Sequence, residues 1–333
     1  MPSSLERINV AFEARAPRLV EPHTQALRLF NGFTEGDPSL IAELYGRTLV
    51  LFDYAPDGDE AKMNQVAELA RKRWPWLNAA IWKQRRSTNQ DFRNGSALFG
   101  AESDYDRRIE EDGVKYTLKL DLNRDSSLYP DTRTLRQWLK KSMNGKRVLN
   151  TFAYTGALGV AAKAGGASSV VQLDLNKSFL NVAKDSFTLN GFPVKRIDFR
   201  TGDFFVEVGR LKRENALFDC VILDPPLQSV TEKGRFDLQA ELERLVNKLR
   251  PLVAHEGALV LVVNALFVSG KELLERLETL CADGYLTVAE RIDAPDDVAG
   301  LEQVDVKWPA DPAPFNSPSK MVVLRAKRKD GRA

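Results

Sequence analysis

Residues 218–226 read Phe218-Asp219-Cys220-Val221-Ile222-Leu223-Asp224-Pro225-Pro226. The first six are mostly apolar and predict a buried strand. That strand delivers the carboxyl group of Asp224 to a turn with two prolines, which fix φ and remove two backbone donors. A turn this rigid suits a reaction in which alignment of the reactants supplies much of the rate. An ordinary strand-ending turn has the same signature, so the meaning of the stretch depends on its surroundings.

The stretch lies within a regular alternation of predicted strands and helices. After a helix expected over residues 131–142, strands are expected at 147–151, 169–173, 197–201, 218–223, 258–263, 285–291 and 321–325. Helices are expected between them at 156–164, 178–190, 235–249 and 270–282. This alternation predicts an α/β fold with a doubly wound, mostly parallel sheet of seven strands. Because no helix separates the last two strands, we expect them to pair as a hairpin and leave an antiparallel edge.

The first third of the chain mixes short strand-like and helix-like segments. The clearest are a strand at 49–52, a helix at 59–72, a strand at 78–82 and an alternating strand at 113–122. We therefore expect two domains. The first is a smaller α+β domain over residues 1–120 with a role in substrate recognition, and the second is a catalytic domain over residues 121–333.

The composition excludes several classes of protein. The 333 residues carry a net charge of +2, so the overall charge does not require a polyanionic partner. No apolar run approaches the roughly 18 residues of a membrane helix, and the N-terminus has no secretory signal. Two cysteines and two distant histidines form neither a disulfide framework nor a metal site. We expect a cytoplasmic protein with no metal and no membrane partner.

Basic residues gather in two places. From Lys320 onward the chain carries six lysines and arginines against one acid, Asp330. A second cluster is close in sequence to three tryptophans and consists of Lys83, Arg85, Arg86 and Arg93. Basic side chains beside aromatic rings suit the phosphates and unstacked bases of RNA. A solvated face and a charged terminus explain the same residues more simply.

The first strand of the alternating half ends in a loop with a single early glycine. The loop reads Asn150-Thr151-Phe152-Ala153-Tyr154-Thr155-Gly156-Ala157-Leu158-Gly159. In a doubly wound sheet ligands bind at the carboxyl ends of the strands, so this loop is a candidate binding element. Tyr154 occupies the position of the first glycine in the dinucleotide fingerprint, which argues against a dinucleotide. A cofactor without a pyrophosphate needs only one close approach, at Gly156.

Two carboxylates follow the next two strands. Asp174 comes 174 − 156 = 18 residues after Gly156, near the roughly 20 expected of a carboxylate that accepts hydrogen bonds from a ribose. Asp203 follows the third strand, where an adenine amino group could be held with Phe204 against the ring. Capping of the following helix explains Asp203 equally well, whereas Asn176 or Ser178 could cap the helix after Asp174 instead.

Together these residues resemble the motifs of class I S-adenosylmethionine-dependent methyltransferases, with their Rossmann-like sheet of seven strands. The stretch from Val148 to Gly156 is similar to the first motif of a bacterial 23S ribosomal-RNA methyltransferase family, whose members act on cytosine C5 or guanine N7. The segment Leu128-Tyr129-Pro130-Asp131-Thr132-Arg133 resembles that family's Phe-x-Asp-x-Arg element. The resemblance covers about residues 25–330, without the family's N-terminal RNA-binding module.

The resemblance implies S-adenosylmethionine as cofactor and ribosomal RNA as substrate. The cofactor-binding residues it implies are Arg133, Asn150, Phe152, Ala153, Tyr154, Thr155, Gly156, Asp174, Leu175, Gly202, Asp203, Phe204 and Asp224. The catalytic residues it implies are Asp224, Pro225 and Pro226. Candidates to hold the acceptor are Tyr129, Arg133, Asn264 and Phe315.

The chain departs from the family's cytosine C5 chemistry. That reaction uses a cysteine nucleophile after the fifth strand, whereas residues 262–266 contain none. Cys220 and Cys281 are expected to be packing residues. We therefore expect direct transfer to an atom that already has a lone pair, such as guanine N7.

Several other functions remain compatible with the sequence. The enzyme could methylate an acceptor other than RNA. A dinucleotide-dependent oxidoreductase is opposed by Tyr154 and the proline pair, and a non-catalytic RNA-binding protein by the intact Asp174, Asp203 and Asp224. The sequence leaves a homodimer open.

Overall fold

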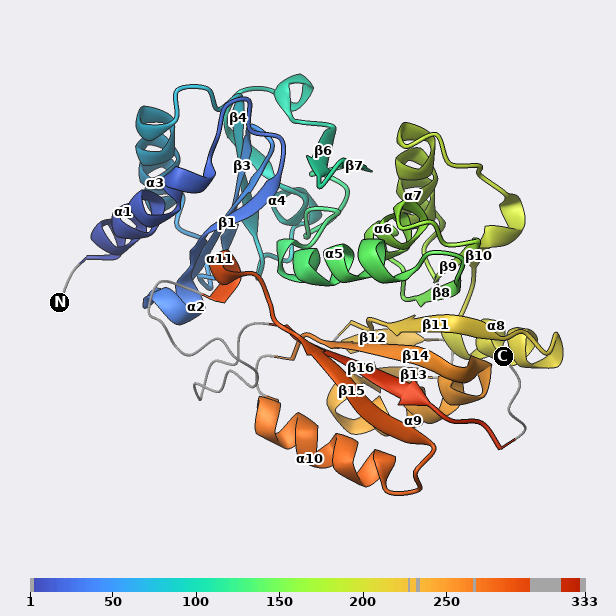
Figure 1. The fold of residues 1–333 in the computed structure, drawn as a ribbon. Coiled ribbons are helices and arrows are strands. Elements are labelled where there is room, and N and C mark those ends of the chain that lie inside the picture. The colour runs from blue at the N-terminus through green and yellow to red at the C-terminus, as the bar shows by residue number, and fades with distance from the viewer. Residues whose placement is uncertain (1–2, 227, 232–233, 266–267, 300–318, 330–333) are drawn as a thin grey trace. The chain divides into compact units, whose positions relative to one another are not determined.

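The computed structural model describes residues 3–226, 228–231, 234–265, 268–299 and 319–329 (Figure 1). These residues divide into two compact units, one made of 3–130 with 295–299 and the other of 131–294 with 319–329. The chain therefore passes from the first unit to the second after Pro130 and returns to the first after Ala294. No helix among the described residues combines the length and the apolar character needed to cross a lipid bilayer.

The first unit is built on a five-stranded sheet in the order β1-β2-β3-β4-β5. The strands are β1 (Ala26–Asn31), β2 (Leu40–Tyr45), β3 (Thr48–Asp53), β4 (Ala79–Gln84) and β5 (Ser96–Phe99). The pair β3 and β4 is parallel because α3 (Glu60–Arg73) connects the two strands, and the other pairs are antiparallel. The remaining elements are α1 (Ser4–Arg15), α2 (Gly32–Glu35), α4 (Gln90–Asn94), β6 (Arg108–Glu111) and β7 (Val114–Thr117).

Helices α1 and α3 supply much of the apolar core of this unit. Phe12 of α1 and Met63 of α3 are fully buried against strand residues such as Leu29 and Leu51. The side chain of Asp59 caps α3 by accepting from the backbone N–H of Lys62 at 3.0 Å. The strand expected at 49–52 and the helix expected at 59–72 are confirmed by β3 and α3.

The returning segment is held in the first unit by polar contacts. It forms the short helix α11 (Asp296–Ala299). Asp297 is 2% exposed, and its carboxylate accepts from the backbone N–H of Arg28 at 2.9 Å. Arg15 donates to the carbonyl oxygen of Asp297, and Asn31 donates to that of Val298. Nothing in the local sequence indicates this association, because its partners are more than 260 residues apart.

The second unit is built on a seven-stranded sheet in the order β10-β9-β8-β11-β14-β16-β15. The strands are β8 (Arg147–Thr151), β9 (Ser169–Asp174), β10 (Phe199–Thr201), β11 (Phe218–Leu223), β14 (Val253–Val263), β15 (Leu286–Ile292) and β16 (Lys320–Ala326). The pairs from β10 to β14 are parallel. The expected α/β fold with a seven-stranded sheet is confirmed, and its last strand, β16, is antiparallel to both neighbours.

The position of the antiparallel strand differs from the expectation. Strands β15 and β16 do pair, but β16 inserts between β14 and β15, so the edge strand is β15. Buried β16 is nearly continuously apolar, whereas five central residues of β15 are exposed. Apolar composition on both faces thus decides which strand of the pair lies inside.

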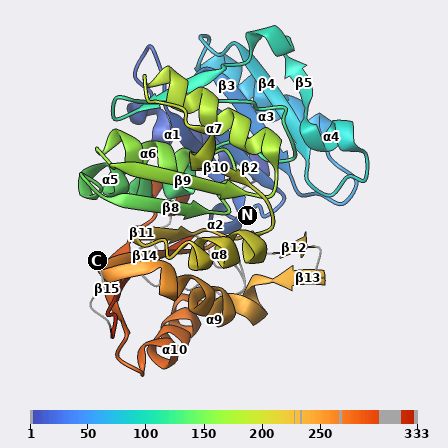
Figure 2. The same cartoon turned by 90° about the vertical axis from the view of Figure 1, so that its right-hand side faces the viewer.

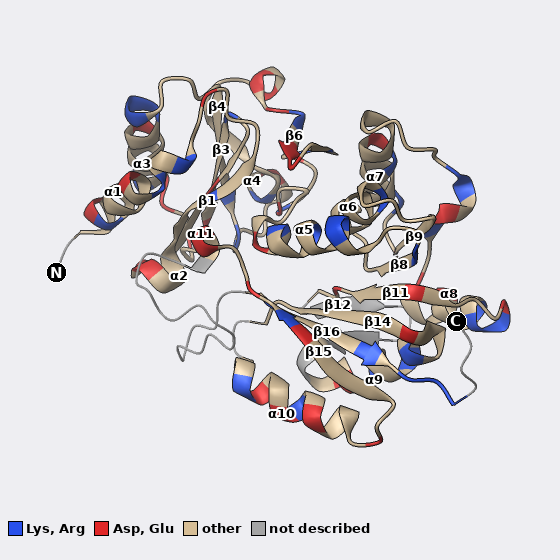
Figure 3. Cartoon of the chain, in the orientation of Figure 1, with Lys and Arg blue, Asp and Glu red and all other residues tan. Residues whose placement is uncertain are grey.

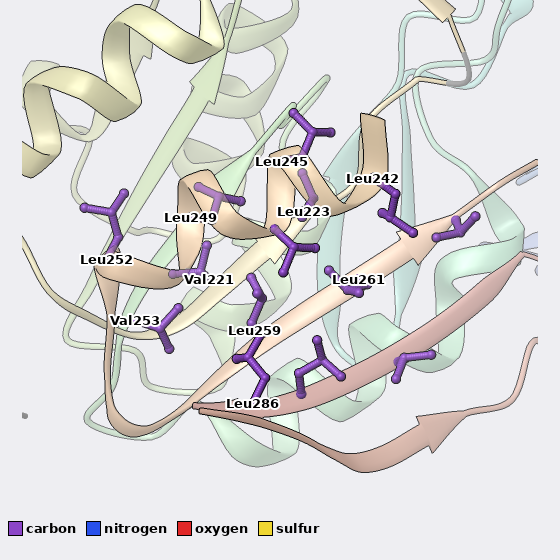
Figure 4. Close-up of a cluster of buried hydrophobic side chains, with 14 of the residues drawn as sticks. Val221, Leu223, Leu242, Leu245, Leu249, Leu252, Val253, Leu259, Leu261 and Leu286 are labelled. Carbon is purple, nitrogen blue, oxygen red and sulfur yellow. The ribbon is translucent and has the colours of Figure 1, made fainter. Parts of the chain in front are cut away.

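Two layers of helices cover this sheet. Helices α5 (Arg133–Ser142), α6 (Ala157–Ala164) and α7 (Lys177–Leu189) lie on one face, and α8 (Phe204–Arg213), α9 (Leu238–Leu249) and α10 (Gly270–Cys281) lie on the other (Figure 2). Figure 4 shows the core under α9, where Leu242, Leu245 and Leu249 meet Val221 and Leu259 of the sheet. These side chains are at most 1% exposed.

Several expected elements have different bounds, and the strand expected over 258–263, for example, begins at Val253. The helix expected over 235–249 begins at Leu238, because residues 234–237 form strand β13 (Gly234–Asp237) in a hairpin with β12 (Gln228–Thr231). The strand expected over 113–122 ends at Thr117, although its alternation continues to Leu120. There the backbone N–H of Lys119 donates to Ser127 Oγ instead of to a strand partner.

Candidate functional site

Most of the predicted site residues converge at one edge of the seven-stranded sheet. In the parallel register Thr151 is opposite both Leu173 and Leu223, and Asp174 is opposite Thr201. Leu223 is in turn opposite Leu261. The loop after β8, Asp174, Gly202 and Asp224 therefore lie along the same edge, at the carboxyl ends of the strands.

The loop after β8 has an unusual backbone. Phe152, Tyr154 and Gly156 have φ angles of +53°, +50° and +77°, so every second residue is left-handed. Such values are costly for residues with a side chain and are concentrated at functional sites. Hydrogen bonds within the protein hold this backbone, because the N–H groups of Ala153 and Gly156 donate to the carbonyl oxygens of Leu173 and Ala153. A Cβ at Gly156 would lie 2.5 Å from the Cβ of Ala183, so the loop has no room for a larger residue there.

A buried amide supports this loop from within the sheet. Gln172 is fully buried, and its side chain donates to the carbonyl oxygen of Gly156 at 3.0 Å. Asn150 donates to the same Gln172 side chain at 2.8 Å. Asn150 is 1% exposed, so its side-chain amide supports the loop from behind. Gly159 is required because a Cβ there would lie 2.3 Å from the Gln172 amide.

Asp174 is tied to the loop by hydrogen bonds. Its carboxylate accepts from the backbone N–H groups of Tyr154 at 2.7 Å and Asn176 at 2.8 Å. Burial raises the pKa of Asp174, while these backbone donors oppose the shift. The next residue, Leu175, has an exposed side chain, and the carbonyl oxygen of Asp174 accepts from Gly202 at 3.0 Å. The second and third strand ends are thereby joined.

Asp203 caps helix α8, as the simpler interpretation of the sequence allowed. One carboxylate oxygen accepts from the backbone N–H groups of Phe205 at 2.9 Å and Val206 at 3.2 Å. Phe204 is buried and stacks on Phe152, with ring centroids 4.7 Å apart. Phe204 thus packs against the loop after β8, and its position against an adenine ring stays a prediction.

Asp224 has an acidic neighbour that the sequence did not single out. Burial and the negative charge of Asp131 raise the pKa of Asp224 from 3.8 to about 8. Asp131 is 6% exposed, and Ser319 Oγ donates to its Oδ2. Its other oxygen, Oδ1, is buried and has no hydrogen-bond partner among the described residues. The sequence could have pointed to Asp131, because this residue occupies the third position of the segment that resembles the Phe-x-Asp-x-Arg element.

The remaining predicted residues are distributed over both units. Pro225 is buried, Pro226 and Asn264 are exposed, and Arg133 is half-buried at the start of α5. Tyr129 belongs to the first unit and is 37% exposed. The buried Ala153 and Thr155 complete the loop after β8. Phe315 lies outside the described residues.

A family model described as S-adenosylmethionine-dependent methyltransferase matches residues 79–307. The chain belongs to this family. Its cofactor is S-adenosylmethionine, and the buried, unpartnered oxygen of Asp131 fits a polar ligand bound at this edge.

Two relatives of this methyltransferase share one name with each other, ribosomal RNA large subunit methyltransferase I. The ribosomal RNA large subunit methyltransferase I of Aeromonas salmonicida is 30% identical over 227 residues, which are 67% of this chain and 56% of that protein. The enzyme of that name from Erwinia tasmaniensis is 25% identical over 304 residues, 90% of this chain and 73% of its own length. The chain thus spans less than two thirds of the Aeromonas protein.

A solved structure has the same fold as the methyltransferase. It is described as a candidate methyltransferase complexed with SAH, and it superposes with a TM-score of 0.82 over 98% of this chain and 83% of that chain. Its sequence identity is 21%, so the likeness concerns the fold alone.

The cysteines of the methyltransferase are placed as the sequence predicted. Cys220 is fully buried in β11, and burial raises the pKa of its thiol to about 12. Cys281 ends α10 and packs at the margin of the core. Neither is a reactive thiolate, because reactivity requires a lowered pKa. Among the described residues, no group of three or more histidine, cysteine or acidic side chains could hold a metal ion.

Several residues of the two basic clusters make contacts within the protein, whereas the sequence had suggested contacts with RNA. Lys83 is fully buried and donates to the carbonyl oxygens of Asn94, Asn123 and Asp125 at 2.6–2.8 Å. Arg85 pairs with Asp125 at 2.5 Å. The described part of the basic C-terminal segment is seen in Figure 3. There Arg328 donates to backbone carbonyl oxygens, so that part of the segment is anchored to the sheet.

Proposed function

We propose that this methyltransferase acts on a base of large-subunit ribosomal RNA. The support is the name of relatives such as the Aeromonas salmonicida protein, which is 30% identical over 67% of this chain. The acceptor is a ring or amino nitrogen, or another atom with a lone pair, and guanine N7 is the simplest example. If the base lies in a helix, it has to be flipped out before it can react.

The proposal of direct transfer rests on one observation. The strand β14 ends at Val263 and is followed by Asn264 and Ala265, so the place where C5 enzymes of the resembling family carry a nucleophile holds no cysteine. The thiol of Cys220 cannot substitute, because it is buried in the sheet and its pKa is raised to about 12. A lone-pair acceptor needs no covalent enzyme intermediate.

We assign the residues of the sheet edge to two tasks. The loop 152–156 and Asp174 bind the methyl donor, which supplies an electrophilic methyl group when it is bound. Asp224 and the carbonyl oxygen of Pro225 orient the acceptor. Arg133 and Asn264 are proposed to hold the acceptor. Separately, the first unit, to which Tyr129 belongs, is proposed to contribute to substrate recognition. The two prolines hold Asp224 and the Pro225 carbonyl group rigidly in place. Less entropy is therefore lost when the acceptor is aligned with the methyl donor.

The experiment is transfer of labelled methyl from S-adenosylmethionine to ribosomal RNA isolated from cells that lack this protein. Asp224→Ala serves as the inactive variant, and Asp219→Asn, at the other end of the same strand, is the matched control. Label in large-subunit RNA with the wild type and the control supports the proposal, and nuclease mapping then gives the atom. Donor binding without transfer to any RNA fraction would overturn the RNA substrate and leave the family assignment intact.

A further inference from the structure

An open groove of about 550 Å³ lies along β10, the strand at one edge of the seven-stranded sheet. Its lining residues come from the short helical turn η4 (Arg196–Asp198), from β10 and from α8 with its C-cap. Ile197, which lines the groove, is 69% exposed. Three arginines and two glutamates supply the charged side chains of the groove, namely Arg196, Arg200, Arg210, Glu207 and Glu214. None of these residues belongs to the loop and the aspartates of the candidate site.

Glutamates hold two of the three arginines in place. The side chain of Glu207 is 5% exposed, pairs with Arg210 and has its Oε2 3.9 Å from Nη1 of Arg200. Glu214 accepts from Nη2 of Arg200 at 2.8 Å. This hydrogen bond, together with the charges of Arg200, Arg210 and Arg213, lowers the pKa of Glu214. Because a guanidinium has five N–H donors, an arginine paired in this way is already ordered and still has donors for a further anion.

The third arginine, Arg196, is exposed and forms no ion pair within the described part of the chain. Its charge is therefore available to a ligand. Residues 195–214 carry six lysines and arginines against four acids, and two of those acids, Asp203 and Glu207, are buried. Figure 3 shows basic residues in the segment before β10 and at the end of α8. The exposed surface of the groove thus has an excess of positive charge, which favours an anionic ligand.

The groove reaches the candidate site along the edge of the sheet. Its lining includes Thr201, at the carboxyl end of β10. The next residue, Gly202, donates to the carbonyl oxygen of Asp174 at 3.0 Å. Strands β9 and β8 separate β10 from β11, which delivers Asp224. At about 4.8 Å per strand, β10 and β11 are roughly 14 Å apart, so a single strand of RNA can occupy the groove and place a base beside Asp224.

We propose that this groove binds phosphates of the RNA strand that flanks the acceptor base. The inference rests on the RNA substrate proposed above. Arginine suits this role because its planar and permanently charged guanidinium binds phosphate oxygens through paired hydrogen bonds. Phosphate contacts fix the position of a nucleic acid without reading its sequence. The groove therefore aligns the strand, while the choice of the base is made at the carboxyl ends of the central strands.

The test begins with Arg196→Gln, which removes the unpaired charge and breaks no ion pair of the fold. Its affinity for large-subunit ribosomal RNA from cells that lack this protein is measured over a range of salt concentrations. We expect binding to weaken several-fold and the slope of log Kd against log salt to decrease by about 0.7–0.9, the value for one lost phosphate contact. In the transfer assay, KM for RNA should rise by the same factor with kcat unchanged. Arg196→Lys keeps the charge and should retain most of the affinity.

Arg291→Gln is the matched control, because Arg291 is an exposed arginine on β15, at the opposite edge of the same sheet, without an ion pair among the described residues. Its RNA affinity and salt slope should equal those of the wild type. If the wild type methylates RNA and Arg196→Gln behaves like this control, the groove proposal is overturned and the RNA substrate stands. Weaker binding of S-adenosylmethionine by Arg196→Gln without RNA would assign the groove to the donor and overturn the proposal as well. RNA that the wild type neither binds nor methylates would overturn the proposed function and the groove proposal together.

Discussion

The backbone N–H of Tyr154 donates a 2.7 Å hydrogen bond to Oδ2 of Asp174 and so joins the loop after β8 to the end of β9. Tyr154 has a φ of +50°, which this bond helps to hold. The carboxylate thus shapes the loop in addition to standing beside the proposed ribose position.

Asp174→Asn is expected to weaken binding of S-adenosylmethionine at least tenfold. The amide keeps the size of the side chain but loses the charge that accepts from Tyr154 and Asn176, and hydrogen bonds to a charged group contribute about 1.5–3 kcal/mol. Calorimetric titration measures the effect. Asp185→Asn, at an exposed position on α7, is the control. Unaltered affinity in Asp174→Asn would remove Asp174 from the binding site.

Gly156→Ala is expected to lower both stability and donor affinity. The positive φ of +77° and the 2.5 Å approach to Ala183 together cost about 2–4 kcal/mol. Gly191→Ala is a matched control, because Gly191 has a φ of +69° with nothing near the added Cβ. Chemical denaturation should show a clearly larger loss for Gly156→Ala. Equal losses would mean that only the backbone angle matters and that the loop has spare room.

The raised pKa of Asp224 predicts how stability depends on pH. Between 3.8 and about 8, the folded state holds a proton on Asp224 that the unfolded state has released. The folded state therefore binds more protons in this window, and stability is lost as pH rises through it. We expect the ligand-free wild type to lose about 3–4 kcal/mol relative to Asp224→Asn between pH 5 and pH 8, because this window spans three pH units and each contributes about 1.4 kcal/mol until the folded pKa is reached. Parallel pH profiles of the two proteins would contradict this expectation.

Lys83→Met is expected to destabilise the first unit by about 3 kcal/mol or more, because three buried carbonyl oxygens lose their donor. Thermal unfolding measures the change. Arg86→Met, in the same basic cluster but exposed, should be nearly neutral for stability. If both variants unfold like the wild type, Lys83 has no structural role and its part in RNA binding should be reconsidered.

Local sequence was sufficient for the elements that line the site. The apolar run before Asp224 forms β11 with the expected bounds, and the loop ending at Gly156 follows β8 as expected. The secondary structure of such residues can be predicted from their neighbours in the sequence, because strand periodicity and turn chemistry are local properties. The same local signals failed at 234–237, where hairpin pairing overrides an apparent helix start.

The sequence by itself determined the family, the order of most strands and helices in the catalytic half and the residues at the carboxyl ends of the strands. Only the tertiary structure decided that β16 inserts between β14 and β15, that Lys83 is buried, and that Ser319 reaches Asp131. These features depend on contacts between residues far apart in the chain. Their energies arise from burial and strand pairing in the assembled sheet, which no local pattern records.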